Sequence, residues 1–277
     1  MRFLRPICVC IMITLACAGF LFWSNFVIDT ESVQIELKKL PSAFENLRIV
    51  ELADLHGREF DTDNAYLLQA VRAAKPDLIC INGDLLDENT DQSMLKPLLR
   101  GLCEIAPTFY VTGNHEWQLD NLQTVLRKME EYGVTVLQNE YTVLVRGEAR
   151  LVIAGVNDPC GPWDQKTPQE LVTQIRKEEG EDACILMLAH RNDTIDMWAE
   201  LGVDLVLTGH CHGGVVRLPF VGGVFGTKRR LFPEYDAGLF AKENTRLFVS
   251  RGLGYTNVRL RLFNRPHLPV LTLVNNS

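Results

Sequence analysis

Five short motifs constrain this chain more than any other feature, because each places metal-binding side chains directly after an apolar run. Five of the six histidines belong to these motifs. Histidine, aspartate and asparagine supply the nitrogen and oxygen atoms that bind manganese, iron or zinc. Histidines with purely structural roles would not all follow predicted strands. The motifs are Asp54-Leu55-His56, Gly83-Asp84-Leu85-Leu86-Asp87, Gly113-Asn114-His115-Glu116, Ala189-His190 and Gly209-His210-Cys211-His212-Gly213-Gly214.

Strands and helices alternate in the predicted first half of the globular part. This order indicates parallel strands joined by crossover helices. Ligands bind at the carboxyl ends of parallel strands, so five strand ends can bring the five motifs to one site. The predicted strands are Leu47 to Leu52, Asp77 to Ile81 and Thr108 to Val111, and the predicted helices are Asn64 to Ala74, Gln92 to Leu102 and Leu119 to Tyr132.

The second half adds a further set of strands. The predicted elements are a β-hairpin of Tyr141 to Val145 with Arg150 to Ala154, a helix over Pro168 to Lys177, and strands over Cys184 to Leu188, Leu205 to Leu207, Leu247 to Ser250, Val258 to Leu262 and Val270 to Val274. We therefore expect an α/β fold of two packed mixed β-sheets flanked by helices, a four-layer αββα sandwich, preceded by one transmembrane helix. The expected division is 1–28 as membrane anchor, 29–46 as linker or edge strand, and 47–277 as the globular domain.

The N-terminal segment from Pro6 to Ile28 carries no charge and is long enough to span a bilayer as a helix. Arg2 and Arg5 precede it, so the positive-inside rule predicts that everything after Asp29 lies outside the cytoplasm. A cleaved signal peptide is the alternative, because Ala16-Cys17-Ala18 resembles a cleavage site. The apolar run continues beyond that point, which favours an uncleaved anchor over a signal peptide. An uncapped apolar run at a chain end also argues against a buried core helix.

Composition excludes some partners. A formal net charge of -7 argues against binding to a nucleic-acid duplex, which requires a positive surface. Nothing in the sequence implies a protein partner. The eight cysteines show no paired zinc spacing, and no disulfide can be argued from the sequence.

The motifs offer seven nitrogen or oxygen ligands, which is too many for one tetrahedral zinc ion. The number suits two divalent ions that share a bridging carboxylate, an arrangement that clamps a phosphoryl group and activates water. The seven candidates are Asp54, His56, Asp84, Asn114, His190, His210 and His212.

These five motifs, in this order, resemble those of the calcineurin-like metallophosphoesterase superfamily over about Leu47 to Val274. The resemblance implies that Asp54, His56 and His212 hold one ion, that Asp84 bridges, and that Asn114, His190 and His210 hold the other. It implies that His115 contacts the phosphate and protonates the leaving group, and that Glu116 orients His115. Asp87 is expected to support the site from behind. Arg191-Asn192-Asp193 departs from the Asn-Pro-Asp that often follows the lone histidine.

The apolar N-terminus and the tail Ser250 to Gly254 are similar to those of the bacterial membrane-anchored phosphodiesterase branch. This resemblance implies hydrolysis of a phosphodiester or pyrophosphate bond by a metal-bridging hydroxide, on a lipid-linked or nucleotide substrate such as UDP-diacylglucosamine. A phosphomonoesterase and a non-catalytic metal-containing protein are the alternatives. Arg251 and Arg229 are candidate substrate contacts, with a structural role or a solvated loop as their alternatives. His267 belongs to no motif and is expected to be a surface or structural histidine.

Overall fold

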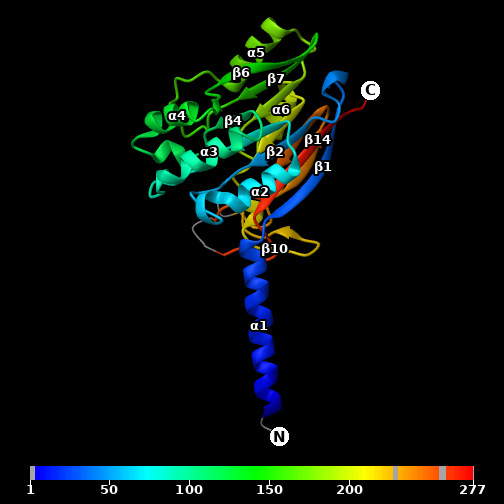
Figure 1. The fold of residues 1–277 in the computed structure, drawn as a ribbon. Helices are drawn as coiled ribbons and strands as arrows, with labels where there is room; N and C mark the ends of the chain where they lie inside the picture. The colour runs from blue at the N-terminus through cyan, green and yellow to red at the C-terminus, as the bar shows by residue number, and fades with distance from the viewer. Residues whose placement is uncertain (1–3, 227–229, 256–259, 277) are drawn as a thin grey trace.

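A long helix projects from a globular α/β domain (Figure 1) in the computed structural model, which describes residues 4–226, 230–255 and 260–276. The projecting helix is α1 (Leu4–Phe26), and only 6% of its apolar stretch is buried. The alternative of a buried core helix is therefore wrong. A membrane anchor and a signal sequence both agree with an exposed apolar helix at this position.

The first sheet carries the first three motifs and has six strands in the order β1-β14-β2-β3-β4-β5. They are β1 (Asp29–Leu37), β2 (Arg48–Leu52), β3 (Leu78–Asn82), β4 (Thr108–Val111), β5 (Thr135–Val136) and β14 (His267–Asn275). The last four strands in that order run parallel, whereas β14 is antiparallel to β2 and parallel to β1. The sheet is therefore mixed, with β1 as an edge strand.

The second sheet also has six strands, in the order β12-β13-β9-β8-β7-β6. They are β6 (Glu140–Arg146), β7 (Ala149–Gly155), β8 (Ile185–Leu188), β9 (Leu205–Thr208), β12 (Gly238–Lys242) and β13 (Thr245–Val249). The four central strands are parallel, and the two outer strands pair antiparallel to them. A separate two-stranded hairpin consists of β10 (Arg217–Leu218) and β11 (Gly222–Gly223).

Three buried apolar clusters define four layers and confirm the predicted αββα sandwich. One cluster lies between the first sheet and α2 (Ala65–Ala74), α3 (Leu95–Cys103) and α4 (Leu122–Glu131). The second joins the two sheets, and the third joins the second sheet to α5 (Pro168–Glu179) and α6 (Ile195–Glu200). Short 3₁₀ turns complete the described elements: η1 (Ser42–Phe44), η2 (Thr62–Asn64), η3 (Gln92–Met94), η4 (Glu116–Gln118) and η5 (His212–Gly214).

Local sequence explains these elements. Every residue of β3 is buried because the strand lies between a helical layer and a second sheet, and its sequence Leu-Ile-Cys-Ile-Asn is accordingly almost continuously apolar. Helix α5 begins at a capping box, in which Thr167 and Glu170 bond each other's backbone N–H groups, and Pro168 occupies the first turn.

Several hydrogen bonds join the end of α1 to the globular domain. The buried side chains of Ser24 and Asn25 both donate to the carbonyl of Arg261. In return, the Arg261 N–H donates to the Asn25 amide oxygen at 2.8 Å. Arg58 donates to the Asn25 carbonyl, and Arg265 donates to the carbonyls of the two residues between α1 and β1.

These hydrogen bonds also explain why part of the strand predicted for Val258 to Leu262 does not form. Residues 256–259 lie outside the described residues, and 260–262 form no strand. Leu262 makes one isolated bridge with Val216. Both backbone groups of Arg261 are already bonded to the end of α1, so they cannot join a sheet ladder. Helix α6 and strand β12 were not predicted.

Candidate metal centre

The five motifs follow the carboxyl ends of parallel strands from both sheets. Strands β2, β3 and β4 lead into the first three motifs, and β8 and β9 lead into the last two. The two sheets place these strand ends together, as the ligand-atom distances below show. The convergence predicted from strand order is therefore present in the structure.

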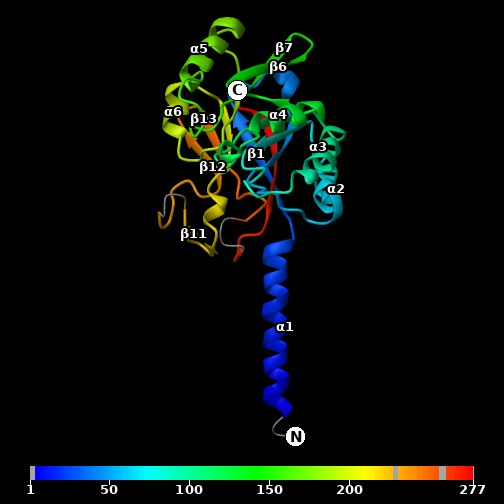
Figure 2. The same cartoon turned by 90° about the vertical axis from the view of Figure 1, so that its left-hand side faces the viewer.

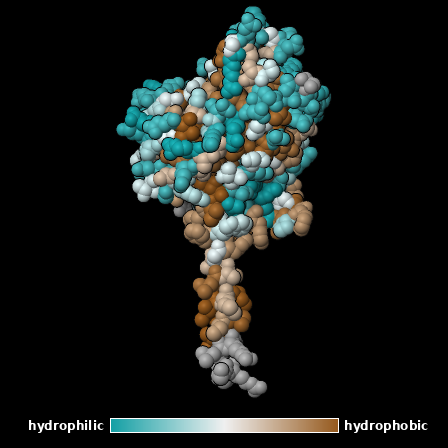
Figure 3. All heavy atoms as spheres, turned by 45° about the vertical axis from the view of Figure 1, so that its right-hand side comes forward, coloured by the Kyte–Doolittle hydropathy of each residue, from teal (hydrophilic) through white to brown (hydrophobic). Residues whose placement is uncertain are grey.

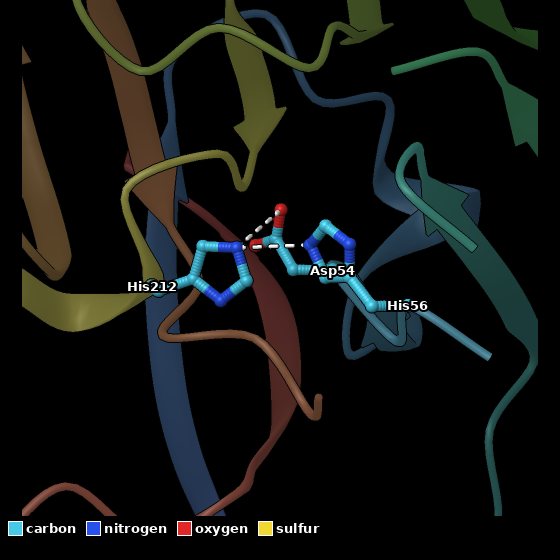
Figure 4. Close-up of side chains that lie close together, drawn as sticks. All are labelled: Asp54, His56 and His212. Atoms are coloured by element: carbon cyan, nitrogen blue, oxygen red, sulfur yellow. Dashed lines mark hydrogen bonds and ion pairs between the residues drawn. The ribbon is translucent and has the colours of Figure 1, made fainter. Parts of the chain in front are cut away.

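One group of side chains contains Asp54, His56 and His212, whose potential ligand atoms lie within 4.8 Å of one another (Figure 4). The Nε2 atoms of His56 and His212 are 3.0 Å apart, and His212 Nε2 is 3.8 Å from Asp54 Oδ1. Asp87 binds Nδ1 of His56 at 2.5 Å, so this carboxylate holds the ring proton on Nδ1. The Nε2 lone pair of His56 then points into the group.

A second group contains Asp84, His190 and His210, again within 4.8 Å. His190 Nδ1 donates to the carbonyl of Asn82 at 2.9 Å, so Nε2 is the ring atom that faces Asp84 Oδ2, at 3.1 Å. His210 Nδ1 lies 3.1 Å from that same Nε2 atom. Asp84 Oδ2 is also 3.8 Å from His56 Nε2, so the carboxylate lies between the two groups.

The residues fit two divalent cations on two observations. Ring nitrogens and carboxylate oxygens converge in two groups around one shared carboxylate, an arrangement that suits a pair of ions. In addition, the Oδ1 atom of Asn114 is buried without a hydrogen-bond partner among the described residues. A buried oxygen without a partner is costly, and a cation would satisfy it.

The backbone at these positions is unusual. Five of the seven candidate ligands have positive φ, namely Asp54, His56, Asp84, His210 and His212. Asp and His tolerate this left-handed conformation better than most residues, and strained backbone concentrates at functional sites. Glycine is required beside them, because a Cβ on Gly113 would lie 2.2 Å from Asp84 Oδ1.

Charges in the centre depend on burial. Burial lowers the pKa of His210 to about 3 and holds the pKa of His212 well below its usual value, which favours the neutral form of both rings. Burial raises the pKa of Asp54 to about 6. Burial also opposes a charge on His190, but Asp84 raises the pKa of His190 to about 10. A divalent cation bound by both residues would displace that proton.

His115 and Glu116 have different surroundings. His115 is partly exposed, and its Nδ1 atom lies 3.0 Å from Asp87 Oδ1. That hydrogen bond raises the pKa of His115. Glu116 is fully buried and accepts the backbone N–H groups of Asp84, Leu86 and Gly113. The carboxylate beside the His115 ring is therefore Asp87, and Glu116 braces the loops of two motifs instead of orienting His115.

Arg191 and Asp158 are site residues that sequence reasoning missed. Asp158 holds the Arg191 guanidinium through two hydrogen bonds of 2.6 and 2.9 Å. The remaining Nη1 of Arg191 lies 2.8 Å from His210 Nε2. A signal did exist, because Asp158 follows the end of β7 as the motif residues follow their strands.

The other predicted contacts lie elsewhere. Arg251 pairs with Asp29 of β1 at 2.7 Å and approaches Glu31 at 3.6 Å, which favours its structural role. Arg229 lies outside the described residues. His267 is fully buried between Glu31 and the Arg251 backbone N–H, so it is structural and not a surface histidine.

Comparison with known proteins agrees with this geometry. The family model for calcineurin-like phosphoesterases matches residues 47–214. The phosphodiesterase YaeI of Escherichia coli (strain K12) is 32% identical over 82% of each chain. The uncharacterized metallophosphoesterase YkuE of Bacillus subtilis (strain 168) is 28% identical over 91% of this chain and 87% of that protein. A metallophosphoesterase of Aquifex aeolicus (strain VF5) is 32% identical over 90% and 93%.

A metal-dependent phosphoesterase is thus the class that the sandwich and its histidine–aspartate groups define. The chain belongs to the calcineurin-like phosphoesterase family.

The shared carboxylate gives a direct test. We expect the wild-type chain to hold two divalent ions and Asp84→Asn to lose most of both, because one neutral oxygen cannot offset two cations. Asp204→Asn is the matched control, since Asp204 is also buried but accepts the backbone N–H of Ile185, outside the centre. Elemental analysis of purified protein measures the difference. At most one ion in a fully active wild-type chain would contradict the paired centre.

Proposed function

We propose that the chain hydrolyses a phosphodiester or pyrophosphate bond using two divalent ions, manganese, iron or zinc. The observation that carries the proposal is the position of Asp84 Oδ2, which lies 3.1 Å from His190 Nε2 and 3.8 Å from His56 Nε2 and so is shared by neighbouring ligand groups. Asp54, His56 and His212 would hold one ion, Asn114, His190 and His210 the other, and Asp84 would touch both. Ions held there would supply a water of lowered pKa and would neutralise charge on phosphoryl oxygens.

The protein's own residues supply the rest of the chemistry. His115 lies at the edge of the centre, where its ring centroid is 4.7 Å from that of His56. Asp87 bonds both rings, so it fixes the position of His115 and favours its protonated form. We assign His115 as the group that contacts the phosphate and protonates the leaving oxygen, and Glu116 as the carboxylate that keeps the Asp84 and Gly113 loops in place.

One comparison supports a diester or pyrophosphate over a monoester. The relative YaeI, which is 32% identical, is named a phosphodiesterase.

The exposed apolar helix α1 supports an anchor over 1–28, with 47–277 as the phosphoesterase domain and the segment 29–46, which contains β1, joining the two. An anchored domain on the outer face would meet lipid-linked phosphates or nucleotides. UDP-diacylglucosamine is both lipid-linked and a nucleotide derivative, and its hydrolysis would require access to the cytoplasmic side.

The proposal is tested with a pair of synthetic substrates. The metal-loaded chain is expected to hydrolyse bis-p-nitrophenyl phosphate with a higher kcat/KM than p-nitrophenyl phosphate, and a chelator should abolish both activities. A preference for the monoester would favour a phosphomonoesterase on the same scaffold. Full metal loading without turnover of either substrate, or of pyrophosphates, would contradict a catalytic role.

His115→Ala should separate chemistry from metal binding. We expect the variant to keep both ions but to lose about 10²–10⁴-fold in turnover, the usual contribution of a positioned acid. The loss should shrink for esters whose leaving groups are strongly acidic, because these need no proton. Elemental analysis beside steady-state kinetics measures both effects. Loss of the ions from this variant would show that His115 is a ligand instead.

Protease accessibility tests the proposed topology. Arg2 and Arg5 precede the apolar span in the sequence, and the positive-inside rule therefore predicts that residues after Asp29 lie outside. Protease added to intact spheroplasts should therefore digest the globular domain. Digestion only after lysis would show that the globular domain lies on the cytoplasmic side. Release of a soluble domain that begins near Gly19 would identify the segment as a cleaved signal peptide.

A further inference from the structure

Six large apolar side chains are exposed on one small substructure beside the end of α1. We call it the apolar hairpin surface. It consists of Leu218, Phe220, Val221, Phe225, Leu231 and Phe232. Phe220 is 108% exposed and Phe232 is 57% exposed. A soluble surface rarely gathers so many large apolar side chains without a partner to cover them.

Backbone bonds hold these residues together as one unit. Strands β10 and β11 pair, Phe225 bridges Leu231, and the Phe232 N–H donates to the carbonyl of Val224. The surface is therefore a folded part of the domain.

The backbone shows that the aromatic residues are not there for turn geometry. Phe220 and Phe232 have φ of 66° and 52°, and Phe263, next to this unit, has φ of 53°. Bulky side chains are unfavourable in this conformation, where a turn prefers glycine or asparagine. Strain of this kind at exposed aromatic residues points to a function of the side chains.

The surface lies at the end of the domain from which α1 emerges, as both views show (Figures 1 and 2). Figure 3 shows apolar residues on the underside of the domain beside the apolar stem. Phe263 connects the two, because its ring packs in a tilted arrangement against Phe20 of α1, with 4.8 Å between centroids. Its neighbour Leu262 bridges Val216, just before β10. The hairpin surface and α1 are thus parts of one apolar face.

Polar and aromatic groups at this junction suit a bilayer interface. Trp23 is exposed near the end of α1, and the Arg265 guanidinium lies 4.9 Å above its ring. Tryptophan and arginine are favoured where hydrocarbon meets headgroups. Arg230, exposed next to Leu231, adds a cation where phospholipids carry phosphate.

We propose that the apolar hairpin surface is a second membrane contact, which lies in the headgroup region beside α1. The metal centre is close behind it, because the candidate ligand His212 begins η5 and Gly214 of η5 packs directly on Gly223 of β11. The centre would then open toward the bilayer surface and take phosphoesters carried by lipids. The contact rests on the proposed anchor and not on the proposed reaction.

Photocrosslinking in membranes tests this contact with the full chain. p-Benzoylphenylalanine replaces one residue at a time at three positions of similar exposure: Phe22 in α1 (61%), Phe232 (57%) and Val145 at the far end of the second sheet (57%). We expect phospholipid adducts at Phe22 and Phe232, and none above the unilluminated background at Val145. Mass spectrometry of the labelled chain identifies the adducts. Phe220 provides a second probe position, in case the probe at Phe232 disturbs the fold.

Each other outcome overturns the proposal in a distinguishable way. Adducts at Phe22 without adducts at Phe232 or Phe220 would show that the hairpin surface stays in water. Crosslinks from Phe232 to a second copy of the chain would assign the surface to self-association. The absence of a lipid adduct at Phe22 would contradict both the proposed anchor and the proposed membrane contact. Hydrolytic activity is not the readout, so these results are independent of the proposed reaction.

Discussion

The buried carboxylate of Asp84 joins the two halves of this molecule. Its backbone and side chain contact loops from the first sheet, and its Oδ2 atom faces His190 from the second sheet at 3.1 Å. A buried anion is costly unless it is paired, so the arrangement requires positive charge between the sheets. The same side chain therefore contacts residues from both sheets and lies between the two groups of candidate ligands.

A second group of residues supports this carboxylate. Glu116 accepts three backbone N–H groups, and Asp87 contacts two imidazole rings. Fixed partners of this kind decide which ring nitrogen is free to bind a cation. Arg191, held by Asp158, adds a cation at the other side of the centre. The positions of the candidate ligands thus depend on neighbouring residues as well as on the candidate ligands themselves.

Much of this arrangement could be predicted from the sequence, because ligand residues at strand ends carry a local signal. Apolar runs before Asp54, Asp84 and Asn114 predict strands, and strand order predicts that their ends converge. The ion pair of Arg251 with Asp29 could not be predicted, because it depends on the pairing of β1 with β14, far apart in the sequence. The hairpin of β10 and β11 was missed as well, since two-residue strands have no periodicity.

The join between α1 and the domain has a consequence for where the enzyme can act. Two residues separate α1 from β1, and Arg265 donates hydrogen bonds to both of their carbonyls. The connection is therefore short and held in place, unlike a flexible linker. With α1 in a bilayer, the metal centre would stay at a fixed distance from the membrane surface. It would then meet only substrates at that surface. Substrates would then arrive by lateral diffusion, and encounter rates would follow their surface density rather than their bulk concentration.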